Sequence, residues 1–208
     1  MKYVIISAIL LAGFAVLAFL ISSNNSVTTW DTSTFQTINN PHGKTFSKIM
    51  VDLTKYGREV VWISVILLLA VLGKKDGRKV AVLLVITFLI LIPLGTVLKN
   101  EIDRVRPSSE NLLVPPDTKA SFPSGHATIV SAGAAVLLLR FNKGKQIIFS
   151  GILGIEALLV SYSRIYVGVH YPLDVVGGIL LGIGIACAVI ACSKYLVPIF
   201  SYIDNMKK

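Results

Sequence analysis

Charged residues are scarce in this chain. They make up 15% of its 208 residues, whereas hydrophobic residues make up 54% and the mean hydropathy is +0.74. A soluble globular domain carries about a quarter charged residues. The apolar excess is gathered in blocks, which is typical of membrane-spanning segments. Length and composition therefore predict a single integral membrane domain over residues 1–208, with no room for a second, soluble domain.

Cysteines and clustered metal ligands are also few. Cys187 and Cys192 lie in the last apolar block, on roughly opposite faces of a helix, so no disulfide is expected between them. The formal charge is +9, but no basic run with interleaved aromatic residues is present, so nucleic-acid binding is not expected. The acidic residues, Glu101, Asp103 and Asp117 among them, are scattered, and we find no ligand set for Mg²⁺ or Zn²⁺.

Six apolar blocks are present, each near the roughly 17–25 residues that a spanning helix needs. The first follows Lys2 and has no clean small-x-small cleavage site, so we expect an uncleaved helix rather than a signal peptide. The fourth is short unless it begins near Ser124. The sequence thus predicts an all-α fold, a bundle of six transmembrane helices. The blocks cover about residues 3–21, 56–72, 80–98, 127–139, 147–163 and 172–197.

The segment between the first two blocks contains a further helical pattern. Phe46, Ile49, Met50 and Leu53 recur at helical spacing, and the charged residues around them fall off that stripe. This pattern predicts a helix that lies in the membrane interface. An ordinary helix packed on the bundle fits the pattern equally well.

The basic residues indicate an orientation in the membrane. Alternate loops and the two termini carry an excess of lysine and arginine with little acid, whereas the other loops are longer and nearly balanced. The positive-inside rule therefore predicts cytoplasmic termini and outward-facing loops at 22–56, 99–126 and 164–171. The cytoplasmic set is Lys2, Lys74, Lys75, Arg78, Lys79, Arg140, Lys143, Lys145, Lys194, Lys207 and Lys208.

The third block ends in the sequence KNEIDRVRP, on the predicted outer side. Arg106 follows Lys99 by seven positions, about two helical turns, so a continued helix would place both cations on one side. Pro107 would then end the helix. Arg104 lies between them on a different face and is expected to be an ordinary solvated charge.

Two of the three histidines, His126 and His170, lie in the second and third outer loops, each near the start of a following helix. In the sequence PSGH, Ser124 and Gly125 precede His126 at a helix start, where free N–H groups and the helix dipole favour an anion. In SRIYVGVHYPLD, His170 is followed four residues later by Asp174, whose carboxylate could fix the ring tautomer and leave the other nitrogen free as nucleophile or base. Simple helix capping is the alternative in both places.

Three cations share the predicted side of the membrane with both histidines. Lys99, Arg106 and Arg164, together with the capped helix start, suit a phosphoryl group, whose charge is spread over three oxygens. The sequence therefore predicts a phosphate-binding site at the outer end of the bundle.

The order and spacing K-x6-R-P, P-S-G-H and S-R-x5-H-x3-D resemble those of the type 2 phosphatidic acid phosphatase (PAP2) superfamily, and the bacterial membrane branch is similar over essentially the whole chain. The resemblance implies a metal-independent, cofactor-free lipid phosphatase. It implies that His170 is the nucleophile that forms a phosphohistidine, that Asp174 orients it, and that His126 protonates the leaving oxygen. The implied phosphate-binding residues are Lys99, Arg106, Ser124, Gly125 and Arg164.

Several functional alternatives remain open on the sequence. The motifs recognise the phosphate, so polyprenyl pyrophosphate, slightly favoured, competes with phosphatidate and phosphatidylglycerol phosphate as substrate. A vanadate-dependent haloperoxidase, which is soluble, and a non-hydrolytic lipid-binding transporter or scaffold are disfavoured. No obligate protein partner is inferred. Glu156, in the middle of the fifth block, is expected to have a structural role, although an ionisable group at that depth is often functional.

Overall fold

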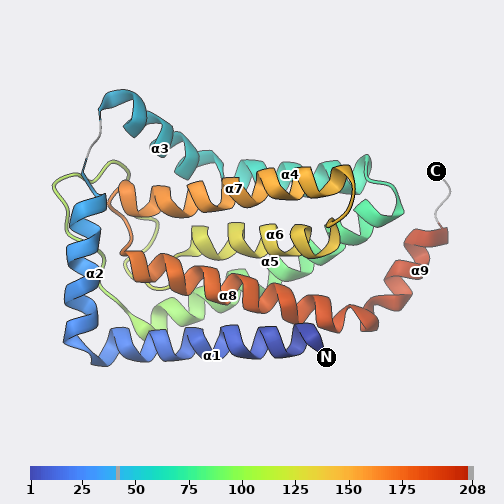
Figure 1. The fold of residues 1–208 in the computed structure, drawn as a ribbon, viewed down its shortest axis with the longest axis horizontal. Coiled ribbons are helices and arrows are strands. Elements are labelled where there is room, and N and C mark those ends of the chain that lie inside the picture. Colours follow the sequence, from blue (N-terminus) through green and yellow to red (C-terminus); the bar gives the residue numbers. More distant parts are fainter. Residues whose placement is uncertain (41–42, 206–208) are drawn as a thin grey trace.

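The computed structural model describes residues 1–40 and 43–205, and these fold into a bundle of helices (Figure 1). No strand occurs among the described residues, where the one isolated bridge pairs Val105 with Ala120. The prediction of an all-α fold is therefore confirmed. The helices are α1 (Lys2–Ser23), α2 (Asn25–Ile38), α3 (Lys44–Tyr56), α4 (Glu59–Val71), α5 (Lys75–Ile102), α6 (Gly125–Arg140), α7 (Lys145–Tyr166), α8 (Pro172–Ala191), the 3-10 helix η1 (Cys192–Leu196) and α9 (Val197–Asn205).

Helix α6 forms the centre of the bundle. Every residue from His126 to Leu137 except Ile129 is buried, because α5, α7 and α8 pack around the helix. Helix α8 approaches α6 very closely at its glycines. A Cβ atom at Gly178 would lie 2.6 Å from the carbonyl oxygen of Ser124, and one at Gly182 would collide with that of Thr128. The G-x-x-x-G pattern in this helix therefore permits the backbone contact that holds the two helices together.

Four stretches are long and apolar enough to cross a membrane: α1, α5, α7 and the stretch Pro172–Asn205 that runs from α8 through α9. Helices α4 and α6 are apolar but have only 13 and 16 residues. The second apolar block is divided at its start, because α3 ends at Tyr56 and α4 begins only at Glu59. Glu156 of α7 faces this turn beside Gly57 and does not line the cavity described below.

The first predicted outer loop contains two helices. The expected helix over the stripe from Phe46 to Leu53 is α3, which packs on α7 through buried Met50, whereas Ile49 is exposed. Helix α2 was not expected from the hydrophobic pattern. It begins after Asn24, whose side chain accepts hydrogen bonds from two backbone N–H groups of the first turn. Figure 1 shows α2 lying across one end of the bundle, with α3 at the same end and α9 at the other.

Candidate active site

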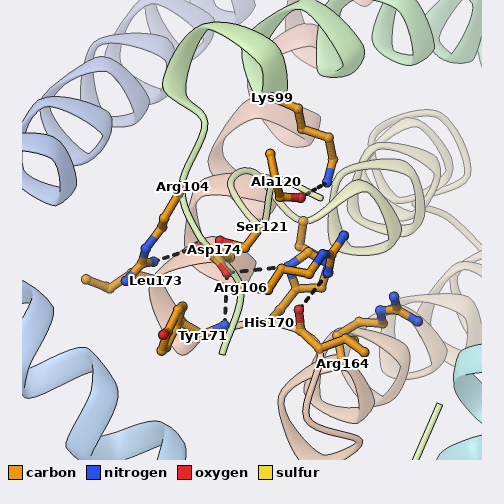
Figure 2. A network of polar contacts seen from close by, with 12 residues as sticks. Lys99, Arg104, Arg106, Ala120, Ser121, Arg164, His170, Tyr171, Leu173 and Asp174 are labelled. Atoms are coloured by element: carbon orange, nitrogen blue, oxygen red, sulfur yellow. Dashed lines mark hydrogen bonds and ion pairs between the residues drawn. The ribbon is translucent and has the colours of Figure 1, made fainter. Parts of the chain in front are cut away.

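The predicted phosphate ligands and histidines come together at the end of the bundle that α2 and α3 cover. Figure 2 shows Lys99, Arg106 and Arg164 around His170, with Asp174 beside the ring and joined to it by a dashed line. The PSGH turn joins this group because the Ser124 N–H donates to the carbonyl oxygen of Asp174 at 3.0 Å. Residues more than seventy positions apart in the sequence thus surround one small space.

The backbone of KNEIDRVRP differs from the prediction of a continued helix. Helix α5 ends at Ile102, where Asp103 adopts the left-handed conformation with φ of 43°. The chain then runs extended, and Val105 forms the bridge to Ala120. Lys99 and Arg106 nevertheless converge, because Lys99 Nζ and Arg106 Nη2 donate to Oγ1 of Thr118 at 3.2 and 3.0 Å. A sharp turn, rather than two further helical turns, places the two cations together.

Arg104 is not the solvated charge that the sequence suggested. Its guanidinium bridges two fully buried carboxylates, donating to Oδ1 of Asp174 at 2.6 Å and to Oδ2 of Asp31 at 2.7 Å. The guanidinium also lies 4.3 Å from the centroid of the Tyr171 ring. The prediction failed because helical periodicity ends at Ile102, so the side chains after it take new directions. Arg104 therefore links α2 to the carboxylate beside His170.

His170 and Asp174 are buried together. Nδ1 of His170 is 3.4 Å from Oδ2 of Asp174, and the same oxygen accepts the Tyr171 N–H at 2.9 Å. Because a carboxylate only accepts, this contact favours the proton on Nδ1 and leaves a lone pair on Nε2. Nε2 faces Nη1 of Arg106 at 3.3 Å. Burial, and then Arg164, Arg106 and Lys99, hold the pKa of His170 well below its usual value, so the ring is neutral and keeps the lone pair on Nε2.

Two buried polar atoms at the site have no hydrogen-bond partner among the described residues. They are Oγ of Ser124 and Nε of Arg164. Buried polar groups normally have hydrogen-bond partners, so these two atoms indicate a ligand that would supply the missing acceptors. The other nitrogens of Arg164 are satisfied, with Nη1 donating to Oγ1 of Thr54 at 2.6 Å and Nη2 to Oδ2 of Asp117 at 3.2 Å. An anion with several oxygens fits these donors and the first turn of α6.

Nδ1 of His126 faces a second group of charged residues. It lies 3.1 Å from Nη1 of Arg58 and 3.6 Å from Oδ2 of Asp117. Sequence reasoning missed both residues, as well as Asp31 and Thr54. Asp117 belongs to a loop with no regular pattern, and only the position of Arg58 beside an apolar block, on the same predicted side as the motifs, could have indicated its role.

A cavity of about 430 Å³ lies next to the site and extends along α4, α5 and α6. Its polar end includes Lys99, Thr118, Gly125 and His170. Its long wall is apolar and comes from α4, α5 and α6, through Trp62, Ile63, Ile66, Phe88, Leu91, Ile92 and Ile129. The shape suits a molecule with a phosphate at one end and a hydrocarbon chain at the other.

An all-helical bundle with membrane-length helices, and with histidines and cations gathered at one end in the order and spacing of the PAP2 motifs, indicates a membrane phosphatase. The chain belongs to the PAP2 superfamily, whose sequence model matches residues 78–198. The resemblance drawn from the motifs is thereby confirmed.

Curated relatives and solved structures agree with this membership. An undecaprenyl-diphosphatase of Sulfolobus acidocaldarius is 51% identical over 71% of this chain and 71% of its own length. The undecaprenyl-diphosphatase BcrC of Bacillus subtilis is 30% identical over 76% of this chain and 80% of its own length. The crystal structure of a transmembrane PAP2-type phosphatidylglycerolphosphate phosphatase from Bacillus subtilis is 27% identical, with a TM-score of 0.75 over 91% of this chain and 96% of that one.

Proposed function

We propose that the protein removes the terminal phosphate from a polyprenyl diphosphate such as undecaprenyl diphosphate. The observation that carries this proposal is the cavity, which joins a long apolar wall to the buried histidine and cations. A prenyl chain would lie along the wall while its diphosphate reaches His170. The two relatives named undecaprenyl-diphosphatase, which align over 71% and 76% of the chain, support the same substrate.

The geometry supports a two-step reaction. Nε2 of His170 attacks the terminal phosphorus, while Asp174 holds the Nδ1–H and stabilises the positive charge that develops on the ring. The bond from phosphorus to the bridging oxygen breaks, and His126, which takes up a proton from water once the anionic substrate is bound, supplies that proton to the oxygen. Water, activated at His126, then hydrolyses the phosphohistidine and releases inorganic phosphate. The transferred phosphoryl group is held by Lys99, Arg106, Arg164, the Ser124 hydroxyl and the Gly125 N–H.

Phosphatidylglycerol phosphate is a second candidate substrate. The structural neighbour that aligns over 91% of the chain is a phosphatase for that lipid, and a phosphatidylglycerophosphatase B of Bacillus subtilis is 40% identical over 43% of the chain. The proposed phosphate-binding residues do not distinguish the lipids, because every one of these substrates presents a terminal phosphate.

Phosphate release from purified protein tests the proposal. Undecaprenyl diphosphate, phosphatidylglycerol phosphate and phosphatidate are supplied in the same detergent at equal concentration. We expect the highest kcat/KM for the diphosphate. A higher value for phosphatidylglycerol phosphate would transfer the assignment to the second candidate, and no release from any of the three would refute a lipid phosphatase.

We further propose that α4 and α6 cross the membrane with the four longer stretches, that α3 lies at the interface, and that the site faces outward. The short α6 is surrounded by longer neighbours, and α3 exposes Ile49 beside Lys48.

The basic loops after α4 and α6 favour cytoplasmic termini. In a variant without Cys187 and Cys192, we expect Lys119→Cys to react with a membrane-impermeant thiol reagent on intact cells, and Lys143→Cys only after permeabilisation. The opposite result would invert the orientation.

A further inference from the structure

Arg58 is a cation at the site that no PAP2 motif includes. It lies in the turn between α3 and α4, before the region that the family model matches, and its side chain is 28% exposed. Its guanidinium pairs with the carboxylate of Glu59 and places Nη1 3.1 Å from Nδ1 of His126. Because arginine only donates hydrogen bonds, Nδ1 is the acceptor in this contact. The guanidinium therefore occupies the space next to the ring nitrogen that the leaving oxygen would approach.

The surroundings of Nδ1 identify this space as part of the same site. Oδ2 of Asp117 is 3.6 Å from Nδ1 and also accepts from Nη2 of Arg164 at 3.2 Å. Arg164 and His126 thus face each other across one carboxylate. A phosphoryl group bound to Arg164 would have its leaving oxygen on the side of His126, and Arg58 would lie beyond that oxygen.

Arg58 also stands at the beginning of the apolar wall. Helix α4 starts one residue later, and its residues Trp62, Ile63 and Ile66 line the cavity together with Arg58 itself. A lipid chain that leaves the phosphate site along α4 must pass the guanidinium first. The chemical group attached directly to the chain, rather than the group being transferred, is therefore the one next to Arg58.

We propose that Arg58 binds the second phosphate of a diphosphate substrate, the one that remains on the lipid. This inference rests on the proposed reaction with a polyprenyl diphosphate. In that reaction the electron pair of the broken P–O bond stays on the bridging oxygen, which becomes part of a lipid monophosphate. A guanidinium beside this phosphate stabilises the added negative charge by charge-assisted hydrogen bonds. Substrate binding would move Nη1 from Nδ1 of His126 to the phosphate oxygens. The freed Nδ1 would then take up a proton from water, favoured by the negative charge of the diphosphate, and pass it to the bridging oxygen.

The same geometry predicts discrimination between substrates. In a lipid monophosphate the leaving oxygen is bonded to carbon, so Arg58 would face an apolar methylene group and form no ionic contact. Protonation by His126 would then be the principal assistance to the leaving group. Arg58 should contribute to the hydrolysis of diphosphates and very little to that of monophosphates.

The test compares Arg58→Gln with wild type on a polyprenyl diphosphate and on the monophosphate of the same chain. We expect kcat/KM to fall about 10- to 100-fold on the diphosphate, at or just below the range for loss of one oxyanion donor, and to change by less than about threefold on the monophosphate. Lys55→Gln is the matched control, because it removes an equal charge one turn earlier on α3, outside the cavity. It should leave both substrates unaffected.

Each other result overturns the inference. Equal losses on both substrates would mean that Arg58 acts on His126 or on the transferred phosphate, and no loss on the diphosphate would mean that it binds neither. A wild-type protein that hydrolyses only monophosphates would refute the proposed function itself. Methylenediphosphonate, which has two phosphonates and cannot be hydrolysed, gives a measurement independent of turnover. Its inhibition constant should rise about 10-fold or more in Arg58→Gln, while that of methylphosphonate stays the same.

Discussion

The two parts of the chain on either side of residue 78 contribute to the site in different ways. The family match covers residues 78–198 and contains all eight residues predicted from the motifs. The part before it contains no motif, yet three polar side chains among its described residues form hydrogen bonds with side chains at the site. Each contacts a different residue of the matched part: Asp31 bonds to Arg104, Thr54 to Arg164 and Arg58 to His126. The matched part supplies the groups proposed to contact the phosphate, and the first part supplies groups that hold or flank them.

The largest effect should come from the proposed nucleophile. His170→Ala removes the atom proposed to accept the phosphoryl group, so we expect turnover to fall at least about a thousandfold, to the background of the assay. No single substitution before residue 78 should match this loss. Helical circular dichroism and gel-filtration elution check that the variant is folded. Hydrolysis at the wild-type rate by folded His170→Ala would refute the covalent mechanism.

Arg164 and its partner Thr54 compare the two parts directly. Arg164→Gln removes a proposed phosphate ligand and should lower kcat/KM by about a hundred- to a thousandfold. Thr54→Val removes only the hydrogen bond at 2.6 Å that orients the guanidinium of Arg164. Loss of one such bond should lower kcat/KM by about 3- to 10-fold. Both values come from initial rates on the same lipid. A larger loss for Thr54→Val than for Arg164→Gln would contradict the division between contact and support.

The sequence predicted the residues that the matched part supplies and little of what surrounds them. The apolar blocks predicted the long helices α1, α5, α7 and α8, but not α2, and the P-S-G-H and S-R-x5-H-x3-D spacings selected His126, Arg164 and His170 as candidates. Both predictions depend on local pattern. Arg104 is different, since its burial depends on Asp31, which is 73 positions away. The end of α5 at Ile102 depends on the left-handed Asp103, which no periodicity signals.

Arg104 and Asp31 should give an intermediate effect. Arg104→Gln leaves the carboxylates of Asp31 and Asp174 buried without their shared cation, so the position of Asp174 beside His170 is disturbed. We expect kcat/KM to fall about 10- to 100-fold, the range seen when residues that orient a ligand are removed. Asp31→Asn should cause a smaller loss, because the amide oxygen still accepts the Leu173 N–H that Asp31 Oδ1 accepts at 2.9 Å.

A double-mutant cycle separates positioning from simple destabilisation. Asp31→Asn combined with Arg104→Gln should lose less activity than the product of the two single losses, because both changes act through Asp174. Lys44→Gln is the control, because Lys44 is exposed and lies before residue 78. Its effect on activity should multiply independently with that of Arg104→Gln. If the losses from Asp31→Asn and Arg104→Gln multiply independently, the ion pair between the two residues does not help to position Asp174 beside His170.

The smallest expected effect concerns the pH dependence of catalysis. Burial, and then Arg164, Arg106 and Lys99, keep the pKa of His170 below its usual value, so we expect the proposed nucleophile to become protonated, and inactive, only on the acid side of pH 6.5. Removing one of these cations with Arg106→Gln makes the imidazolium less unfavourable, which raises the pKa and moves the acid limb of kcat/KM to higher pH. Lys55→Gln removes an equal charge from the first part of the chain and should leave that limb in place. The measurement is the profile of kcat/KM against pH for the two variants. A shift of the acid limb to lower pH in Arg106→Gln would contradict the prediction, and so would equal shifts in both variants. Either result would mean that the acid limb does not reflect protonation of His170 beside Arg106.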